Sequence, residues 1–176
     1  MKPRLFVLFL CASMALAVCA RAKTILPDAC GSDDVKFKVK AREGQPVPTA
    51  PEAGKAQVVF VEVMDKTGLF TGDAITRIGV DGAWVGANKG DSYFTFTVTP
   101  GDHHLCADWQ ADFGPTKEKV GLDFFKAEPG KIYYYQVKIT VISQAAQRSL
   151  VLTRLSEDEG KYRIKASPYS IATPHP

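Results

Sequence analysis

Ile75–Trp109 reads Ile-Thr-Arg-Ile-Gly-Val-Asp-Gly-Ala-Trp-Val-Gly-Ala-Asn-Lys-Gly-Asp-Ser-Tyr-Phe-Thr-Phe-Thr-Val-Thr-Pro-Gly-Asp-His-His-Leu-Cys-Ala-Asp-Trp. Short runs rich in β-branched and aromatic residues alternate with the turn pairs Asp81-Gly82, Lys89-Gly90 and Pro100-Gly101. Asp-Gly is a strong hairpin signal because glycine adopts positive φ without steric cost, and Pro-Gly suits a type II turn. The stretch therefore predicts consecutive β-hairpins. It indicates an architecture and no particular chemical activity.

Other segments extend this pattern in both directions. Val35 to Lys40 alternates apolar residues with lysine, which suits an edge strand. Ala56 to Val63 is nearly all apolar and predicts a central strand covered on both faces. Ile132 to Ile142 is the longest expected strand, and Leu150 to Leu155 the last. The expected fold is all-β, an antiparallel β-sandwich of about 7–9 short strands, with a small barrel as the alternative.

One short C-terminal helix is expected after the strands. Ser156 and Glu159 have the spacing of a capping box, and Pro168 restricts the residue before it, so about two turns are predicted. The expected organisation is a signal peptide at 1–22, an N-terminal extension and proline-rich linker at 23–54, a β-sandwich domain at 55–166 and a disordered tail at 167–176.

The first residues have the pattern of an export signal. Lys2 and Arg4 precede an uncharged run over 5–18, and Ala20-Arg21-Ala22 offers a cleavage site. The run is shorter than the roughly 20 residues of a bilayer-crossing helix, so no stable span is expected after cleavage, with a retained anchor as the alternative. A lipid anchor at Cys19 is disfavoured because Val18 stands where a lipobox has a small residue. The expected location is the periplasm or cell envelope.

Charge gives no indication of a nucleic-acid partner. The chain has 22 basic and 19 acidic residues, and residues 1–22 hold three of the basic ones and no acid. The rest of the chain is therefore balanced at 19 against 19. Because nucleic-acid binding needs a net basic footprint, no nucleic-acid partner is expected.

Two cysteines remain once residues 1–22 are removed, Cys30 and Cys106. In an oxidising compartment a single pair has one connectivity, so we predict a Cys30–Cys106 disulfide. The alternative is two free thiols, with Cys106 simply buried.

Three segments together resemble a bacterial family labelled domain of unknown function 2846, and are similar to PEGA-type β-sandwich units. They are 78–86, 100–106 and 128–134, within a resemblance that covers about 56–161. The resemblance implies an exported bacterial β-sandwich in an envelope-associated role. It implies no activity, cofactor or catalytic residue.

The sharpest candidate for chemistry is the strand containing His103, His104, Cys106 and Asp108. Residues at i, i+2 and i+4 of a strand share a face, and imidazole, thiolate and carboxylate all bind transition metals. Against this, a disulfide removes the thiolate of Cys106, and ligands on one straight strand are about 7 Å apart. The metal site at His103, His104 and Asp108 is therefore the alternative hypothesis.

Sequence motifs give no indication of catalysis. The chain lacks a Gly-x-Ser-x-Gly elbow, a Ser-x-x-Lys motif and a phosphate loop, so no catalytic residue and no cofactor are expected. Tyr134 is expected to face away from the core side of its strand, and with Trp84 it makes a candidate surface for a glycan or protein. Cross-strand aromatic pairing is the structural alternative for these rings. The predicted function is an exported, non-catalytic envelope module that binds a protein or glycan, or is structural; the alternative is the metal-binding protein.

Overall fold

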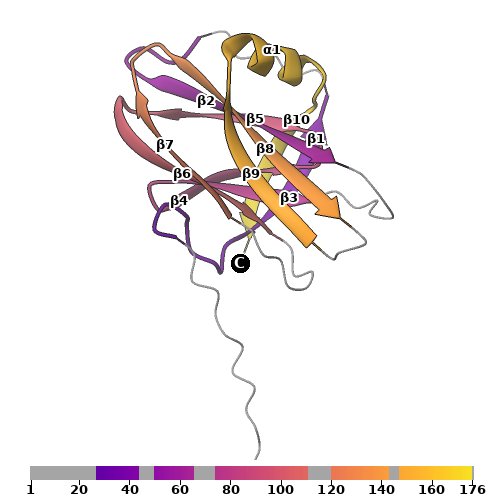
Figure 1. Ribbon diagram of the computed structural model, residues 1–176. Helices are drawn as coiled ribbons and strands as arrows, with labels where there is room; N and C mark the ends of the chain where they lie inside the picture. Colours follow the sequence, from indigo (N-terminus) through magenta and orange to yellow (C-terminus); the bar gives the residue numbers. More distant parts are fainter. Residues whose placement is uncertain (1–26, 44–49, 66–73, 111–119, 143–146, 176) are drawn as a thin grey trace, which may run out of the picture.

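The computed structural model describes residues 27–43, 50–65, 74–110, 120–142 and 147–175 of the chain. These residues form ten strands and one helix (Figure 1). The strands are β1 (Lys36–Arg42), β2 (Ala56–Asp65), β3 (Ile75–Val80), β4 (Ala83–Lys89), β5 (Tyr93–Val98), β6 (Gly101–Trp109), β7 (Val120–Ala127), β8 (Ile132–Ile142), β9 (Gln147–Leu155) and β10 (Tyr169–His175). The helix is α1 (Glu157–Lys165).

The strands make two packed sheets, which confirms the all-β sandwich. A six-stranded sheet has the order β1-β10-β5-β2-β8-β9, and a four-stranded sheet the order β4-β3-β6-β7. Neighbouring strands are antiparallel except for β2 with β8, which are parallel over nine residue pairs, and β10 with β5, which meet at one pair. The six-stranded sheet is thus mixed, because β2 and β8 are distant in sequence and no hairpin joins them.

Alternation along the strands decides which side chains enter the core. On β8, Tyr133, Tyr135, Val137 and Ile139 point between the sheets, as expected. On β6, Leu105, Ala107 and Trp109 do the same, opposite Val58 and Phe60 of β2. Central strand β2 is buried on both faces, because Val59 and Val61 pack on its other side under α1.

Tight glycine turns join the hairpins. Asp81 and Gly82 both have positive φ, 50° and 86°, which is the combination a type I′ turn requires. This turn connects β3 and β4 at the position the sequence indicates.

The expected disordered tail at 167–176 is wrong, because residues 169–175 form β10 inside the six-stranded sheet. β10 pairs antiparallel with β1 from Lys36–His175 to Arg42–Tyr169. Both strands lie outside the predicted 55–166 domain, so the sandwich is longer at each end than expected. β1 is an edge strand, as its lysines predict. The predicted signal peptide, Cys19 and residues 44–49 of the predicted linker lie outside the described residues.

Proline at position 174 is compatible with this strand for a specific reason. Both backbone groups of Phe37, the partner of Pro174, bond the side chain of Gln110: its N–H donates to Oε1 at 2.6 Å and its carbonyl accepts from Nε2 at 3.0 Å. Opposed residues in an antiparallel pair exchange either two hydrogen bonds or none. Phe37 and Pro174 are a pair of the second kind, so β1 needs no N–H from the proline.

Helix α1 caps one end of the sandwich (Figure 1). The Ser156 hydroxyl accepts from the N–H of Glu159, the bond that the predicted capping box requires. Ile164 of α1 is buried against the outer face of the six-stranded sheet. In the described part of the chain, no helix has the length and apolarity needed to cross a bilayer.

Candidate functional site

A groove of about 510 Å³ opens where the two sheets meet at β4 and β10. Its walls are the first half of β4, the start of β5, most of β10 and the segment that leads into β1. The lining residues are Gly31, Ser32, Val35, Phe37, Gly82, Ala83, Trp84, Val85, Gly86, Phe94, Thr95, Tyr169, Ser170, Ile171, Ala172 and Pro174. Its volume is within the range of small-molecule and short-segment binding sites.

The groove exists because β5 and β10 separate. Their only aligned pair in the described strands is Tyr93 with Tyr169, and beyond it each strand leaves the other. β4 is the edge strand of its own sheet and lies beside this gap. Gly86 permits the approach, since a Cβ there would lie 2.5 Å from the ring of Phe94. Backbone edges of β4, β5 and β10 therefore border the groove.

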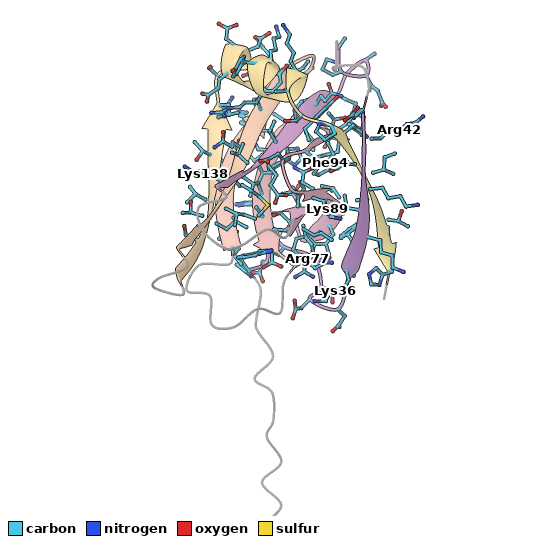
Figure 2. The ribbon with its side chains drawn as sticks, turned by 90° about the vertical axis from the view of Figure 1, so that its right-hand side faces the viewer. Lys36, Arg42, Arg77, Lys89, Phe94 and Lys138 are labelled. Atoms are coloured by element: carbon cyan, nitrogen blue, oxygen red, sulfur yellow. A yellow bond between two sulfur atoms is a disulfide. The ribbon has the colours of Figure 1, made fainter. Side chains whose placement is uncertain are left out.

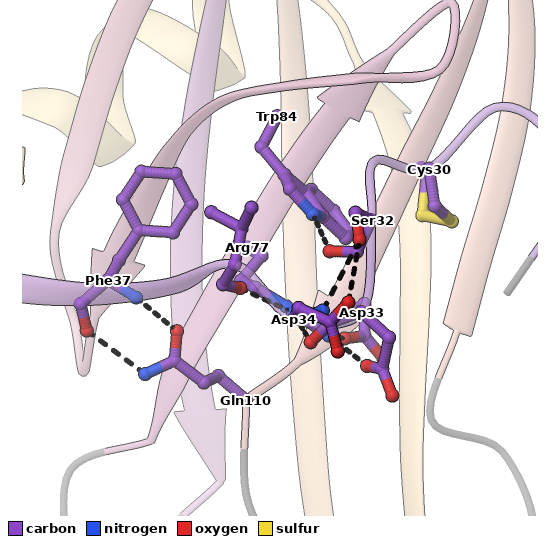
Figure 3. Close-up of polar contacts among 11 residues, drawn as sticks. Cys30, Ser32, Asp33, Asp34, Phe37, Arg77, Trp84 and Gln110 are labelled. Carbon is purple, nitrogen blue, oxygen red and sulfur yellow. Dashed lines mark hydrogen bonds and ion pairs between the residues drawn. A yellow bond between two sulfur atoms is a disulfide. The ribbon is translucent and has the colours of Figure 1, made fainter. Parts of the chain in front are cut away.

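Trp84 is held at the groove wall by contacts on several sides. Its indole Nε1 donates to the carbonyl of Ser32 at 2.8 Å, and the guanidinium carbon of Arg77 lies 4.5 Å from its ring centroid (Figure 3). Gly31 lies against the indole, where a Cβ would come within 2.4 Å of the ring. The ring is half-buried, so it keeps an accessible part in the groove.

Arg77 anchors the segment that supplies one wall. This buried side chain donates to Asp108 from Nε at 3.0 Å and from a terminal nitrogen. It also donates to the Val35 carbonyl at 2.6 Å and to the Asp33 carbonyl and carboxylate at 3.2 and 3.1 Å (Figure 3). These bonds hold residues 33–35 against the outer face of the four-stranded sheet.

The predicted disulfide is present. Cys30 and Cys106 are bonded, with their Cα atoms 5.2 Å apart, and both are buried. Cys30 precedes Gly31 and Ser32, so the bond fixes the same wall of the groove from its other end. One ion-pair network and one covalent bond therefore position the residues that support Trp84.

The lining has a simple chemical character. None of its sixteen residues carries a charged side chain. The lining residues that carry hydroxyl groups are Ser32, Thr95, Tyr169 and Ser170, and the Ser170 hydroxyl is bonded to that of Ser92 at 2.6 Å. Such a lining favours uncharged ligands and supplies no acid, base or metal ligand of the usual types.

The expected Trp84–Tyr134 surface does not form. Trp84 borders the groove, but Tyr134 is 2% exposed. Tyr134 does point away from the core between the sheets, as alternation predicts, but α1 covers it there. The two residues lie on strands of different sheets and form no common surface. The other aromatic residues that line the groove are Phe37, Phe94 and Tyr169, and no pattern in the sequence connects them with Trp84.

The structure does not bring together the alternative metal ligands. His103 points toward the core side of β6, whereas His104 and Asp108 lie on the opposite face, about 14 Å apart along the strand. Asp108 bonds Arg77, and His104 is exposed. Among the described residues, no three His, Cys, Asp or Glu side chains are placed to hold one metal ion.

His103 instead joins two turns. Nδ1 lies 2.6 Å from the Asp81 carboxylate and Nε2 lies 2.7 Å from the Thr99 carbonyl. Only the imidazolium can donate to both acceptors at once. Desolvation by burial lowers the pKa of His103, but the bonds to Asp81 and Thr99 outweigh it and raise this pKa above 6.5. The pair stabilises the β3–β4 turn, which borders the groove.

Comparisons of the chain with protein-family models, curated proteins and solved structures found no match.

Proposed function

We propose that this protein is an exported, non-catalytic module of the bacterial cell envelope, and that it holds an uncharged segment of a protein or glycan partner in the Trp84 groove. One observation carries the proposal: a groove of about 510 Å³ that is partly aromatic, is free of charged side chains, and has a wall held by the Arg77 hydrogen bonds and the Cys30–Cys106 disulfide. The export pattern of residues 1–22 supports the envelope location.

Two partner classes suit the groove for different reasons. A neutral sugar ring can stack on Trp84 and bond hydroxyl groups of the lining. An extended peptide can lie along the free edge of β4 and bond its backbone, with alternate side chains directed into the hollow. The second class makes more use of the three converging strand edges.

The proposal is tested with arrays of neutral oligosaccharides and of uncharged extended peptides, applied to protein with its disulfide formed. The informative variant is Val85→Asp, which places a charge on the exposed groove side of β4. Its matched control is Val151→Asp on β9, because both valines are exposed strand residues, 39% and 48% respectively, and Val151 is not among the lining residues.

We expect Val85→Asp to weaken binding at least tenfold and Val151→Asp to leave it unchanged, with both proteins folded. If Val85→Asp binds the ligand with unchanged affinity, the ligand does not bind in the groove. Recovery of a chemically altered ligand after incubation would remove the non-catalytic assignment.

A further inference from the structure

Strand β1 presents a straight row of four cations to solvent. Lys36, Lys38, Lys40 and Arg42 alternate with Phe37 and Val39, which are buried against β4. Because side chains two apart on a strand share a face, all four cations point away from the sandwich. The labelled ends of the row, Lys36 and Arg42, lie at opposite ends of β1 (Figure 2). The row is about 20 Å long, with about 7 Å between neighbours.

No carboxylate neutralises this row from its own or the neighbouring strand. β1 and β10 contain no Asp or Glu, and the cross-strand partners of the four cations are His175, Thr173, Ile171 and Tyr169. No ion pair joins the row to a carboxylate in the residues that the structure describes. On α1, in contrast, Lys161 pairs with Glu157 and Arg163 with Glu159.

Protection of a sheet edge does not require four cations here. Lysines on an edge strand discourage pairing with another chain. The edge of β1 is already blocked in its first half, since the Gln110 side chain occupies both backbone groups of Phe37. Residues 23–176 are balanced in charge, so the row reflects local segregation of cations rather than a basic protein.

We propose that the β1 row is a binding site for a linear anionic polysaccharide. A line of cations at regular intervals complements a chain that carries acidic groups at intervals, and each lysine side chain can adjust its reach. A bilayer surface presents charges in two dimensions, whereas the cations of β1 lie in one line. The adjacent strand β10 adds only one basic side chain, His175, to this face. Single-stranded nucleic acid is bound through stacked bases, and the two rings that β10 adds to this face, Tyr169 and His175, are both half-buried. The site lies outside the groove, so it does not rest on the proposed function.

The test measures binding of polygalacturonate, with uncharged dextran as the matched polymer. The variant is Lys38→Glu/Lys40→Glu, which reverses the centre of the row. The control is Lys126→Glu/Lys131→Glu, which makes the same change in net charge at two exposed lysines outside β1. Circular dichroism and thermal melting confirm that each protein is folded.

We expect binding of polygalacturonate but not of dextran, with an affinity that falls as salt rises. The β1 variant should lose at least tenfold in affinity and about half of the salt dependence, and the control should lose less than threefold. Equal losses in both variants, or no binding by the wild type, would overturn the proposal. Equal or tighter binding of single-stranded DNA or of vesicles rich in anionic phospholipid would overturn it in favour of that partner.

Discussion

Gly160 of α1 lies directly on the ring of Tyr134 of β8, so closely that a Cβ at Gly160 would come within 2.2 Å of the ring carbon Cγ. This contact seats the helix on the six-stranded sheet and buries Tyr134, whose hydroxyl pKa is raised by desolvation. The glycine weakens the isolated helix, but it permits the close approach of helix and strand.

Gly160→Ala is therefore expected to destabilise the protein, although alanine is the better helix former by about 1 kcal/mol. The methyl group would overpack the interface with Tyr134 and force α1 outward, which costs about 1–3 kcal/mol. Urea unfolding measures the change in free energy.

The partner residue provides the control for this prediction. In the background Tyr134→Ala the space opposite position 160 is open, so Gly160→Ala should there be neutral or stabilising. A double-mutant cycle measures the coupling. If Gly160→Ala stabilises the wild-type protein, the close contact between α1 and β8 is wrong.

Features decided by neighbouring residues could be predicted from the sequence. The Asp81-Gly82 turn, the alternation on β8 and the cap at Ser156 each depend on a few adjacent residues. The disulfide prediction depended on a count of two cysteines in a chain that we expect to be exported. Local geometry and the hydrophobic pattern determine such features.

Features decided by pairing across the chain could not be predicted. The strand β10 forms because β1, more than 120 residues earlier, pairs with it, and because the register places Pro174 opposite Phe37, whose backbone groups bond Gln110 instead of β10. Tyr134 was expected at the surface because its strand pattern does not reveal where α1 packs. The groove arises from the separation of β5 and β10, for which no residue in either strand is a signal. Trp84 was expected to share a surface with Tyr134, but it lines the groove while Tyr134 is buried under α1.

Removal of the disulfide is expected to lower stability substantially. The bond joins residues 76 apart in sequence, and closing a loop of that length stabilises by about 4 kcal/mol in the chain-entropy model. Cys30→Ala/Cys106→Ala should therefore unfold at lower urea concentration than the oxidised wild type. Reductant should lower the stability of the wild type and leave that of the double variant unchanged; a reductant effect of the same size on both would contradict the assignment.

Arg77→Met is expected to destabilise by about 3–5 kcal/mol, because it leaves the carboxylate of Asp108 buried without its guanidinium partner. The variant also loses the bonds to the Asp33 and Val35 carbonyls, so the wall of the groove should loosen. Adding Asp108→Leu should recover a large part of the loss, since an apolar pair replaces the ion pair. A double variant less stable than Arg77→Met would show that Asp108 has a more important partner than Arg77.

The bond between His103 and Asp81 predicts how stability depends on pH. Because the folded pKa of His103 is raised above 6.5, its contribution is fully present below pH 6.5 and is lost as pH rises through the folded value. Desolvation raises the pKa of Asp81, but bonds from the His104 N–H and the His103 ring lower it below 3.8 overall. The contribution of Asp81 is present above pH 3.8 and is lost as pH falls through its folded value. The difference in unfolding free energy between wild type and His103→Gln should therefore be largest between about pH 4 and 6.5, at roughly 1–3 kcal/mol, and shrink toward pH 9.

His104→Gln is the matched control for this prediction, because the exposed His104 contacts Asp81 only through its backbone N–H. A pH-independent difference for His103→Gln would show that the imidazole is neutral in the folded protein.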